Sequence, residues 1–372
     1  MKRIVFILDR VIHYHKELLQ TLESHLSDIN TELYLLSGQS DKKELSRIRV
    51  ESKVIYNELH FSYFELKVRN LTFRYQKNIT VLIKEINPDI VIMSSHVGNI
   101  SSWSLMRLKE KLNFKLISWQ CGYEYNHLKI KNFLLRRFVN KFDYHLAYHT
   151  NAKKYALRYG AKMNQINVVH NTINEANIRV ITKEVAKKQV EERLGIDLNN
   201  KDIILYVGAI LEEKNLEQLC SSVEKLTSKT TLLFIVGDGP YLKELKDQFK
   251  NINNIIFIGS EYNDIGLYFD CADLFVLPGT GGLALNEAMA HRLPIITGYA
   301  DGSADDLVIH NKNGLRLNTG TSTEITKAII TLLNSPETLM KMGNESHKMI
   351  SSKYTYDKFI GRILSSLEAL LN

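Results

Sequence analysis

The residues best suited to chemistry lie between Leu274 and Ile296, in the run LFVLPGTGGLALNEAMAHRLPII. An apolar strand leads into a glycine-rich turn, and a helix with one early carboxylate, Glu287, follows. Glycines let backbone N–H groups approach a ligand, and the start of a helix adds positive partial charge. The pattern predicts a phosphate site, with Glu287 placed to accept hydrogen bonds from sugar hydroxyls. The candidate phosphate contacts are Gly279, Gly281, Gly282 and Leu283. A surface turn capped by glycines is the alternative.

A second candidate group follows another apolar strand, in the run LYVGAILEEKN. Gly208 ends the strand, and a helix begins near Lys214. Open α/β sheets bind ligands at the carboxyl ends of their strands, so we expect the lysine near the phosphate site. A solvated lysine at a helix start, beside Glu212 and Glu213, is the alternative.

A third turn, in the run FIVGDGP, also follows an apolar strand. Pro240 suits the first turn of a helix, which places the turn at the same rim of the sheet. We expect Gly237 and Gly239 to shape the cleft and to contact a ligand only secondarily.

These turns require strands and helices in alternation, and the whole chain has that rhythm. The first half contains strand-like runs at Ile4–Leu8, Leu33–Leu36, Ile90–Met93, Lys115–Trp119, Tyr144–Tyr148 and Asn167–Val169. The second half contains Ile203–Val207, Thr231–Val236, Ile255–Ile258, Leu274–Leu277 and Ile295–Thr297. The order predicts two doubly wound α/β domains of the Rossmann type, with the active site in a cleft between them.

The domain boundaries are placed where the composition of the chain changes from apolar runs to polar, charged residues. Residues 1–173 form the first domain, residues 174–351 the second, and residues 352–372 a C-terminal amphipathic helix that packs back toward the first. The polar segment from Asn174 to Lys201 is either a linker helix or a short helix of one domain.

The composition is that of an ordinary globular protein: 372 residues, 44% hydrophobic and 24% charged. Three unpaired cysteines support neither a disulfide framework nor a cysteine zinc site, and a reducing cytoplasm fits. The short apolar run Ile4–Leu8 predicts a buried first strand rather than a secretory signal. No apolar stretch is long enough to span a membrane.

The net charge of +7 is concentrated in one region. Residues 125–174 carry nine Lys or Arg against the single acid Asp143. Within them, Leu128–Phe142 interleaves five cations with apolar residues, which suits peripheral contact with an anionic membrane. A core-packed helix with a cationic outer face is the alternative. Nucleic acid is disfavoured because no recognition motif accompanies the charge.

Six segments in fixed order carry a family resemblance. They are Phe142–Asn174, Leu205–Leu219, Phe234–Leu245, Ile255–Gly279, Ala284–Ile296 and Asn313–Leu317. Together they resemble the retaining glycosyltransferases of family 4, whose fold is the two-domain GT-B architecture. The resemblance implies an acceptor-binding first domain and a second domain that binds a nucleoside diphosphate-sugar.

The resemblance also implies roles for single residues. Lys214 neutralises the diphosphate leaving group, and Glu287 contacts the ribose of the nucleotide. The chain departs from the family at two positions: Gly279 stands where a first glutamate is usual, and Ala209 where an arginine follows the strand glycine. Both departures affect donor contacts more than the fold.

The first domain is less informative. The turn SWQCGYEYNH offers Gln120, Glu124 and His127 as polar acceptor contacts. His96 and His149 follow predicted strands, where a structural role is the simpler interpretation.

The expected activity is transfer of a sugar from a UDP- or GDP-linked donor to a hydroxyl of a saccharide or lipid-linked saccharide, with retention, in bacterial surface polysaccharide synthesis. No cofactor is expected, and no cluster of aspartates suggests a metal. The expected location is cytoplasmic, at the inner face of the membrane. A non-catalytic sugar-nucleotide-binding or partner subunit of the same fold is the alternative, motivated by Ala209 and Gly279. An epimerase or phosphorylase on this fold has no support from the motifs.

Overall fold

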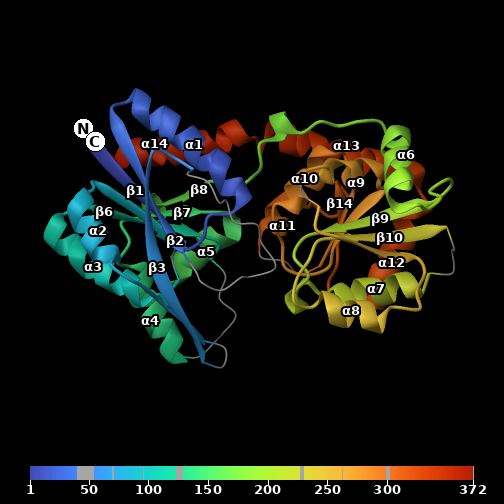
Figure 1. Cartoon of the computed structure of the whole chain (residues 1–372), viewed down its shortest axis with the longest axis horizontal. Helices are drawn as coiled ribbons and strands as arrows, with labels where there is room; N and C mark the ends of the chain where they lie inside the picture. The colour runs from blue at the N-terminus through green and yellow to red at the C-terminus, as the bar shows by residue number, and fades with distance from the viewer. Residues whose placement is uncertain are drawn as a thin grey trace. The chain divides into compact units, whose positions relative to one another are not determined.

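The computed structural model describes residues 1–39, 54–68, 71–94, 96–122, 129–226, 230–261, 263–298 and 302–371. The chain forms two compact units (Figure 1). Unit 1 comprises Met1–Asn171 and Asp357–Asn372, and unit 2 comprises Thr172–Tyr356. The chain therefore passes from one unit to the other twice.

Unit 1 is built on an eight-stranded sheet in the order β4-β3-β2-β1-β5-β6-β7-β8. Its strands are β1 (Lys2–Leu8), β2 (Thr31–Gln39), β3 (Asn57–Val68), β4 (Leu71–Gln76), β5 (Ile90–Ser94), β6 (Lys115–Gln120), β7 (Tyr144–Ala147) and β8 (Ile166–Val168). Its helices are α1 (His13–Asp28), α2 (Ile79–Ile86), α3 (Ile100–Leu112), α4 (Lys129–Val139), α5 (Thr150–Arg158) and α14 (Tyr356–Leu371), with a 3-10 turn at Met163–Gln165.

All neighbouring strands of this sheet are parallel except β3 and β4, which form an antiparallel hairpin at one edge. The sequence analysis identified neither strand. Beyond Phe61, β3 alternates exposed and partly buried residues instead of forming the continuous apolar run of a strand covered on both faces.

Unit 2 contains a six-stranded, entirely parallel sheet in the order β11-β10-β9-β12-β13-β14. Its strands are β9 (Asp202–Val207), β10 (Thr231–Val236), β11 (Ile255–Gly259), β12 (Leu274–Leu277), β13 (Ile295–Thr297) and β14 (Gly314–Arg316). Its helices are α6 (Lys183–Leu194), α7 (Leu216–Glu224), α8 (Leu242–Gln248), α9 (Ile265–Cys271), α10 (Ala284–Ala290), α11 (Ser303–Leu307), α12 (Ser322–Leu333) and α13 (Pro336–Ser352). Short 3-10 turns lie at Glu175–Asn177 and Glu212–Lys214.

The central strands of both sheets are apolar runs because helices cover both faces. In β9 and β12 the run from Ile203 to Tyr206 and the pair Phe275 and Val276 are completely buried. The prediction of two α/β domains with parallel sheets is confirmed, apart from the antiparallel edge strand of unit 1.

The polar segment at 174–201 is part of unit 2 rather than a free linker. Ala186 and Val190 of α6 are fully buried in the core of that unit, and α6 packs against α9. Lys183 is paired with Asp273.

The last helix, α14, belongs to unit 1. The side-chain amide of Asn167 donates to the carbonyl of Arg362 at 3.0 Å and to the Ser366 hydroxyl at 2.9 Å. The ring of Phe359 lies 6.2 Å from that of Trp119. Across the ranges described, none of the helices has both the length and the apolar content needed to span a membrane.

Candidate functional site

The loops after β9 and β12 meet at the carboxyl end of the unit 2 sheet. The Nζ of Lys214 donates to the carbonyl of Thr280 at 2.8 Å and to that of Gly281 at 3.2 Å. The amide of Thr280 donates to the carbonyl of Glu213 at 3.2 Å. Two turns that lie 66 residues apart in the chain therefore form one structure, with a positive charge on the glycine-rich loop.

Gly279 is required by this contact. A Cβ at this position would lie 2.5 Å from the carbonyl oxygen of Glu213 and 2.5 Å from the carbonyl carbon of Lys214. Side chains do not tolerate such distances to backbone atoms. The glutamate that the family resemblance suggested for this position therefore does not fit the backbone seen here, and the close approach of the two loops takes its place.

The loop presents unused hydrogen-bond donors. In the described part of the chain, the backbone amides of Gly281, Gly282 and Leu283 have no acceptor. By contrast, the next amides are engaged, since Leu285 donates to the carbonyl of Gly282 and Glu287 to that of Leu283. Three successive amides without an acceptor at one turn are donors that could meet an anion.

Glu287 lies one turn into α10 and is half-buried. No partner for its carboxylate occurs among the described residues, and burial raises its pKa while nearby His291 lowers it. His291 is itself held, because its Nδ1 lies 2.6 Å from the Oδ1 of buried Asp270. Asp270 also accepts from the amide of Ile181 at 3.0 Å. The unpaired carboxylate is available to hydroxyl groups of a ligand.

The loop after β10 packs directly on the loop after β9. A Cβ on Gly237 would lie 1.9 Å from the carbonyl oxygen of Gly208, and one on Gly239 would lie 2.2 Å from that of Ile210. Gly208 and Gly237 both have positive φ, at 152° and 141°. These glycines allow the two loops to pack closely, backbone against backbone.

Ala209 also has a local partner. The hydroxyl of Tyr206 donates to the Ala209 carbonyl at 2.9 Å, and burial raises the pKa of this phenol well above its usual range. A Cβ on Gly208 would lie 3.0 Å from the same hydroxyl. A buried neutral tyrosine therefore holds the turn after β9 through this hydrogen bond.

A fourth loop at this rim, residues 318–320, was not predicted from the sequence. The carboxylate of Glu324 accepts from the amides of Asn318, Thr319 and Gly320 at 2.7 to 3.0 Å, which lowers its pKa to about 2. The side chain of Asn215 donates to the carbonyl of Gly320 at 3.2 Å. The spacing of Glu324 after Thr321, a helix start with an acid three residues later, was the available signal.

The polar residues proposed for unit 1 have mostly structural partners. His149 is buried and its Nδ1 accepts from the amide of Ala152 at 3.1 Å, so it caps α5. His96 is exposed and accepts from the amide of Gly98. Gln120 is buried at the end of β6. Glu124 and His127 lie outside the described residues.

The basic segment at 128–142 contains α4, and Leu128 lies outside the described residues. Leu135, Phe138 and Val139 are buried in the core of unit 1, so one face of the helix is packed. The exposed side presents Arg136 and Arg137, together with Phe133 at 68% and Leu134 at 42% exposure. Lys141 is paired with Glu110 at 2.8 Å.

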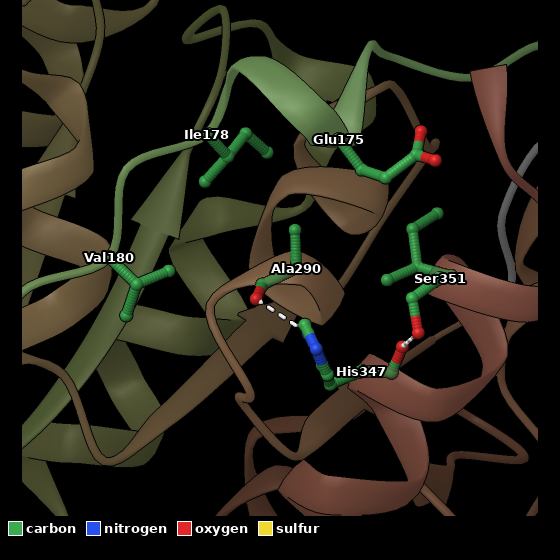
Figure 2. Close-up of a pocket in the computed structure, with 7 residues that line it drawn as sticks. Glu175, Ile178, Val180, Ala290, His347 and Ser351 are labelled. Atoms are coloured by element: carbon green, nitrogen blue, oxygen red, sulfur yellow. Dashed lines mark hydrogen bonds between the residues drawn. The ribbon is translucent and has the colours of Figure 1, made fainter.

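Unit 2 also has a pocket away from these loops (Figure 2). It lies between the segment from Glu175 to Val180, the end of α10 and helix α13, where His347 bonds the carbonyl of Ala290 at 3.1 Å. None of the residues predicted to bind a donor lines it. Among the residues that the structure describes, no group of His, Cys, Asp or Glu could hold a metal ion.

Comparison with known proteins shows which proteins this chain resembles. The family model described as glycosyl transferases group 1 matches residues 188–349, nearly all of unit 2. An uncharacterized glycosyltransferase of Haemophilus influenzae is 28% identical over 297 residues, which are 77% of this chain and 78% of that protein. The alpha-monoglucosyldiacylglycerol synthase of Streptococcus pneumoniae is 26% identical over 257 residues, which are 63% of this chain and 57% of that protein.

Among solved structures, HepE of Anabaena in complex with UDP-glucose matches 99% of this chain and 100% of its own, with a TM-score of 0.75 and 15% identity. The GT-B fold consists of two α/β units, each built on a sheet of mainly parallel strands, as in this chain. Residues 188–349 therefore match the family of glycosyl transferases group 1, and the relatives named above are glycosyltransferases or glycolipid synthases.

Proposed function

We propose that this protein is a glycosyltransferase that moves a sugar from a UDP- or GDP-linked donor to a hydroxyl of a saccharide or lipid-linked saccharide, with retention at the anomeric carbon. The process it would serve is the assembly of a bacterial surface polysaccharide. Unit 2 holds the donor and unit 1 the acceptor.

The supporting observation is the convergence of three kinds of group at one rim of unit 2. The ammonium of Lys214 lies on the loop that carries the free amides of Gly281 to Leu283, and the unpaired carboxylate of Glu287 follows one turn later. A cation and free amides suit a diphosphate, and a carboxylate suits the hydroxyls of a ribose.

The chemistry that follows needs no carboxylate nucleophile. As the bond from the anomeric carbon to the diphosphate breaks, the acceptor oxygen bonds to that carbon on the same face and its proton passes to a phosphate oxygen. The protein then contributes positioning and stabilisation of the leaving group. Lys214 and the loop amides supply the positive potential, so the proposed reaction is independent of a metal and of any cofactor.

The acceptor and the location are inferred from surface chemistry and from one relative. The exposed side of α4 presents two arginines beside Phe133 and Leu134, which suits a peripheral position on the anionic cytoplasmic face of a membrane. The Streptococcus relative is named for a glycolipid. Both favour an acceptor attached to lipid, and no nucleic-acid partner is proposed.

The donor is tested by nucleotide binding and turnover. Thermal stabilisation by UDP, GDP and ADP and by their sugar conjugates identifies the base, since a ligand stabilises in proportion to its binding free energy. Lys214→Ala and Glu287→Ala are expected to lower donor affinity or hydrolysis by about 10- to 100-fold, because each removes one contact to a charged group. The matched controls Lys243→Ala and Glu224→Ala change exposed residues of α8 and α7 and should have no effect. Equal activity in all four variants would sink the assignment.

The alternative of a non-catalytic partner subunit is separated by the same assay. Ala209 and Gly279 lack the side chains that the family resemblance suggests, and the packing at Gly279 leaves no room for one. Tight nucleotide binding with no donor hydrolysis, in the presence of any acceptor tried, would favour the subunit.

A further inference from the structure

Strand β3 of unit 1 pairs with two neighbours along its length. Its residues Asn57 to Ser62 pair with β2, within the part of that strand that the structure describes. From Tyr63 onward, its partner is β4, in a register that places Tyr63 opposite Gln76 and Val68 opposite Leu71. A two-stranded ribbon of this kind has two faces, because successive side chains alternate.

One face of this ribbon is apolar and uncovered. Phe64 lies opposite Tyr75, and Leu66 lies opposite Phe73. Their exposed fractions are 65%, 50%, 48% and 37%, in that order. We call these four side chains the hairpin patch. Apolar side chains that stay in water cost free energy. A contiguous exposed apolar patch therefore indicates an interaction surface.

The other face fixes the ribbon in place. Directly opposite each other, Arg74 and Glu65 are paired at 2.7 Å, and Arg74 also contacts Asp9 at the end of β1, again at 2.7 Å. The side chain of Gln76 donates to the same Asp9 at 2.5 Å. Phe61 of β3 is buried in the core of the unit. The hairpin patch is therefore presented on an anchored element.

The residue types of the patch favour a lipid surface as the occupant. With 150 to 250 Å² for each aromatic side chain, the exposed apolar area is about 400 Å². Phe, Leu and Tyr suit the boundary between headgroups and acyl chains.

The charge of the neighbouring elements favours an anionic lipid surface. Helix α3 packs on β4, next to a backbone bridge between Asn99 and Arg74. The rings of Trp103 in α3 and Phe138 in α4 are tilted against each other, with their centroids 5.2 Å apart. Figure 1 shows α4 at the same end of unit 1 as the part of β3 that follows its pairing with β2. Helix α4 exposes Arg136 and Arg137, which can meet anionic headgroups.

We propose that the hairpin patch inserts into the interfacial layer of an anionic bilayer, with the arginines of α4 on the headgroups. This deepens the membrane contact of the proposed function by naming the element that enters the lipid. It does not depend on the donor chemistry, because every candidate donor residue lies in unit 2.

The test is co-sedimentation of the full chain with vesicles of phosphatidylcholine alone or mixed equally with phosphatidylglycerol. The double variant Phe64→Ser/Phe73→Ser should lower partitioning into the mixed vesicles at least tenfold. The matched control Ile330→Ser/Met340→Ser changes two exposed apolar residues of unit 2 and should leave partitioning unchanged. A Tyr75→Trp reporter should shift its emission to the blue on vesicle binding.

The salt dependence of vesicle binding distinguishes the contribution of the hairpin patch from that of the arginines. Raising the salt from about 0.1 M to about 1 M shortens the screening length from about 10 Å to about 3 Å. Arg136→Gln/Arg137→Gln should weaken only the salt-sensitive part of binding, and the serine variant should weaken the part that survives salt. Vesicle binding that is absent in the wild type, or unchanged in the serine variant, would overturn the proposal.

Two further measurements complete the design. A concentration-dependent dimer that the serine variant abolishes, seen by sedimentation equilibrium, would make a second copy the occupant and overturn the lipid assignment. Nucleotide binding by the serine variant should equal that of the wild type. If the wild-type protein bound no nucleotide, that result would count against the proposed function but would not affect the conclusion from the vesicle experiment.

Discussion

The ammonium of Lys214 donates to the carbonyl of Thr280 at 2.8 Å, so the turn after β9 holds the glycine-rich loop after β12. This contact places a positive charge beside backbone amides that have no acceptor in the described part of the chain. The lysine therefore has a structural role beside the electrostatic role proposed for it, and its replacement should affect the loop as well as ligand binding.

The first prediction concerns Gly279. Gly279→Ala should destabilise unit 2 by about 1 to 3 kcal/mol, because the new Cβ would overlap the backbone of Glu213 and Lys214. It should also weaken nucleotide binding by displacing the loop. Urea unfolding and calorimetric titration measure the two effects.

Gly282→Ala is the matched control in the same loop. A Cβ there would meet nothing within 4 Å, so stability should change by less than about 0.5 kcal/mol. Equal effects of the two substitutions would contradict the packing argument.

The second prediction concerns the protonation of Glu287. Burial raises its pKa, so the carboxylate takes up a proton at a higher pH than an exposed glutamate does. Donor affinity should fall as the pH is lowered through that raised pKa, because the protonated group is a weaker acceptor. Titration of the nucleotide-sugar between about pH 8 and about pH 5 measures this. Glu287→Gln should remove the part of the pH dependence of donor affinity that does not arise from the nucleotide itself. Identical pH profiles in the wild type and the variant would refute a role of Glu287 in donor binding.

The third prediction concerns Glu324, which has a pKa lowered to about 2 by three backbone amides of the 318–320 loop. A depressed pKa stabilises the fold above the unfolded value near 4.5, and this contribution is lost as the pH falls toward 2. Glu324→Gln should cost about 1 kcal/mol at neutral pH, as loss of a cap does, and much less near pH 2. Thermal unfolding at both pH values is the measurement, with Glu224→Gln as the control. A cost that does not depend on pH would exclude the electrostatic explanation.

The fourth prediction concerns His145 of β7, which is buried with its Nδ1 2.6 Å from the hydroxyl of Ser118. Burial lowers its pKa to about 4, so the imidazole is neutral at neutral pH. The unfolded chain binds this proton near pH 6.5, so unit 1 should lose stability as the pH falls from 6.5 to 4. Nuclear magnetic resonance titration should give a midpoint near 4, whereas a midpoint near 6.5 would show that the ring is hydrated.

The sequence predicted the strands of both sheets wherever they are buried on both faces. Runs such as Ile203–Val207 and Leu274–Leu277 have no polar residue to place in water, so a strand covered on both faces accommodates them. The hairpin of β3 and β4 escaped prediction because its residues alternate, and because its apolar side chains face outward, against the usual rule. Glu324 was not predicted because its partners are backbone amides, and the residue types showed only the spacing of an acid three residues after Thr321.

The order of the glycine turns, Lys214 and Glu287 along the chain was enough to indicate an α/β protein with a phosphate-type loop, because strand periodicity and glycine positions are local properties. Only the tertiary structure decided that Lys214 contacts Thr280, that Gly279 has no space for a side chain and that the hairpin patch is uncovered. These features depend on the approach of segments that are distant in the chain. That approach is set by packing, which residue types alone do not specify.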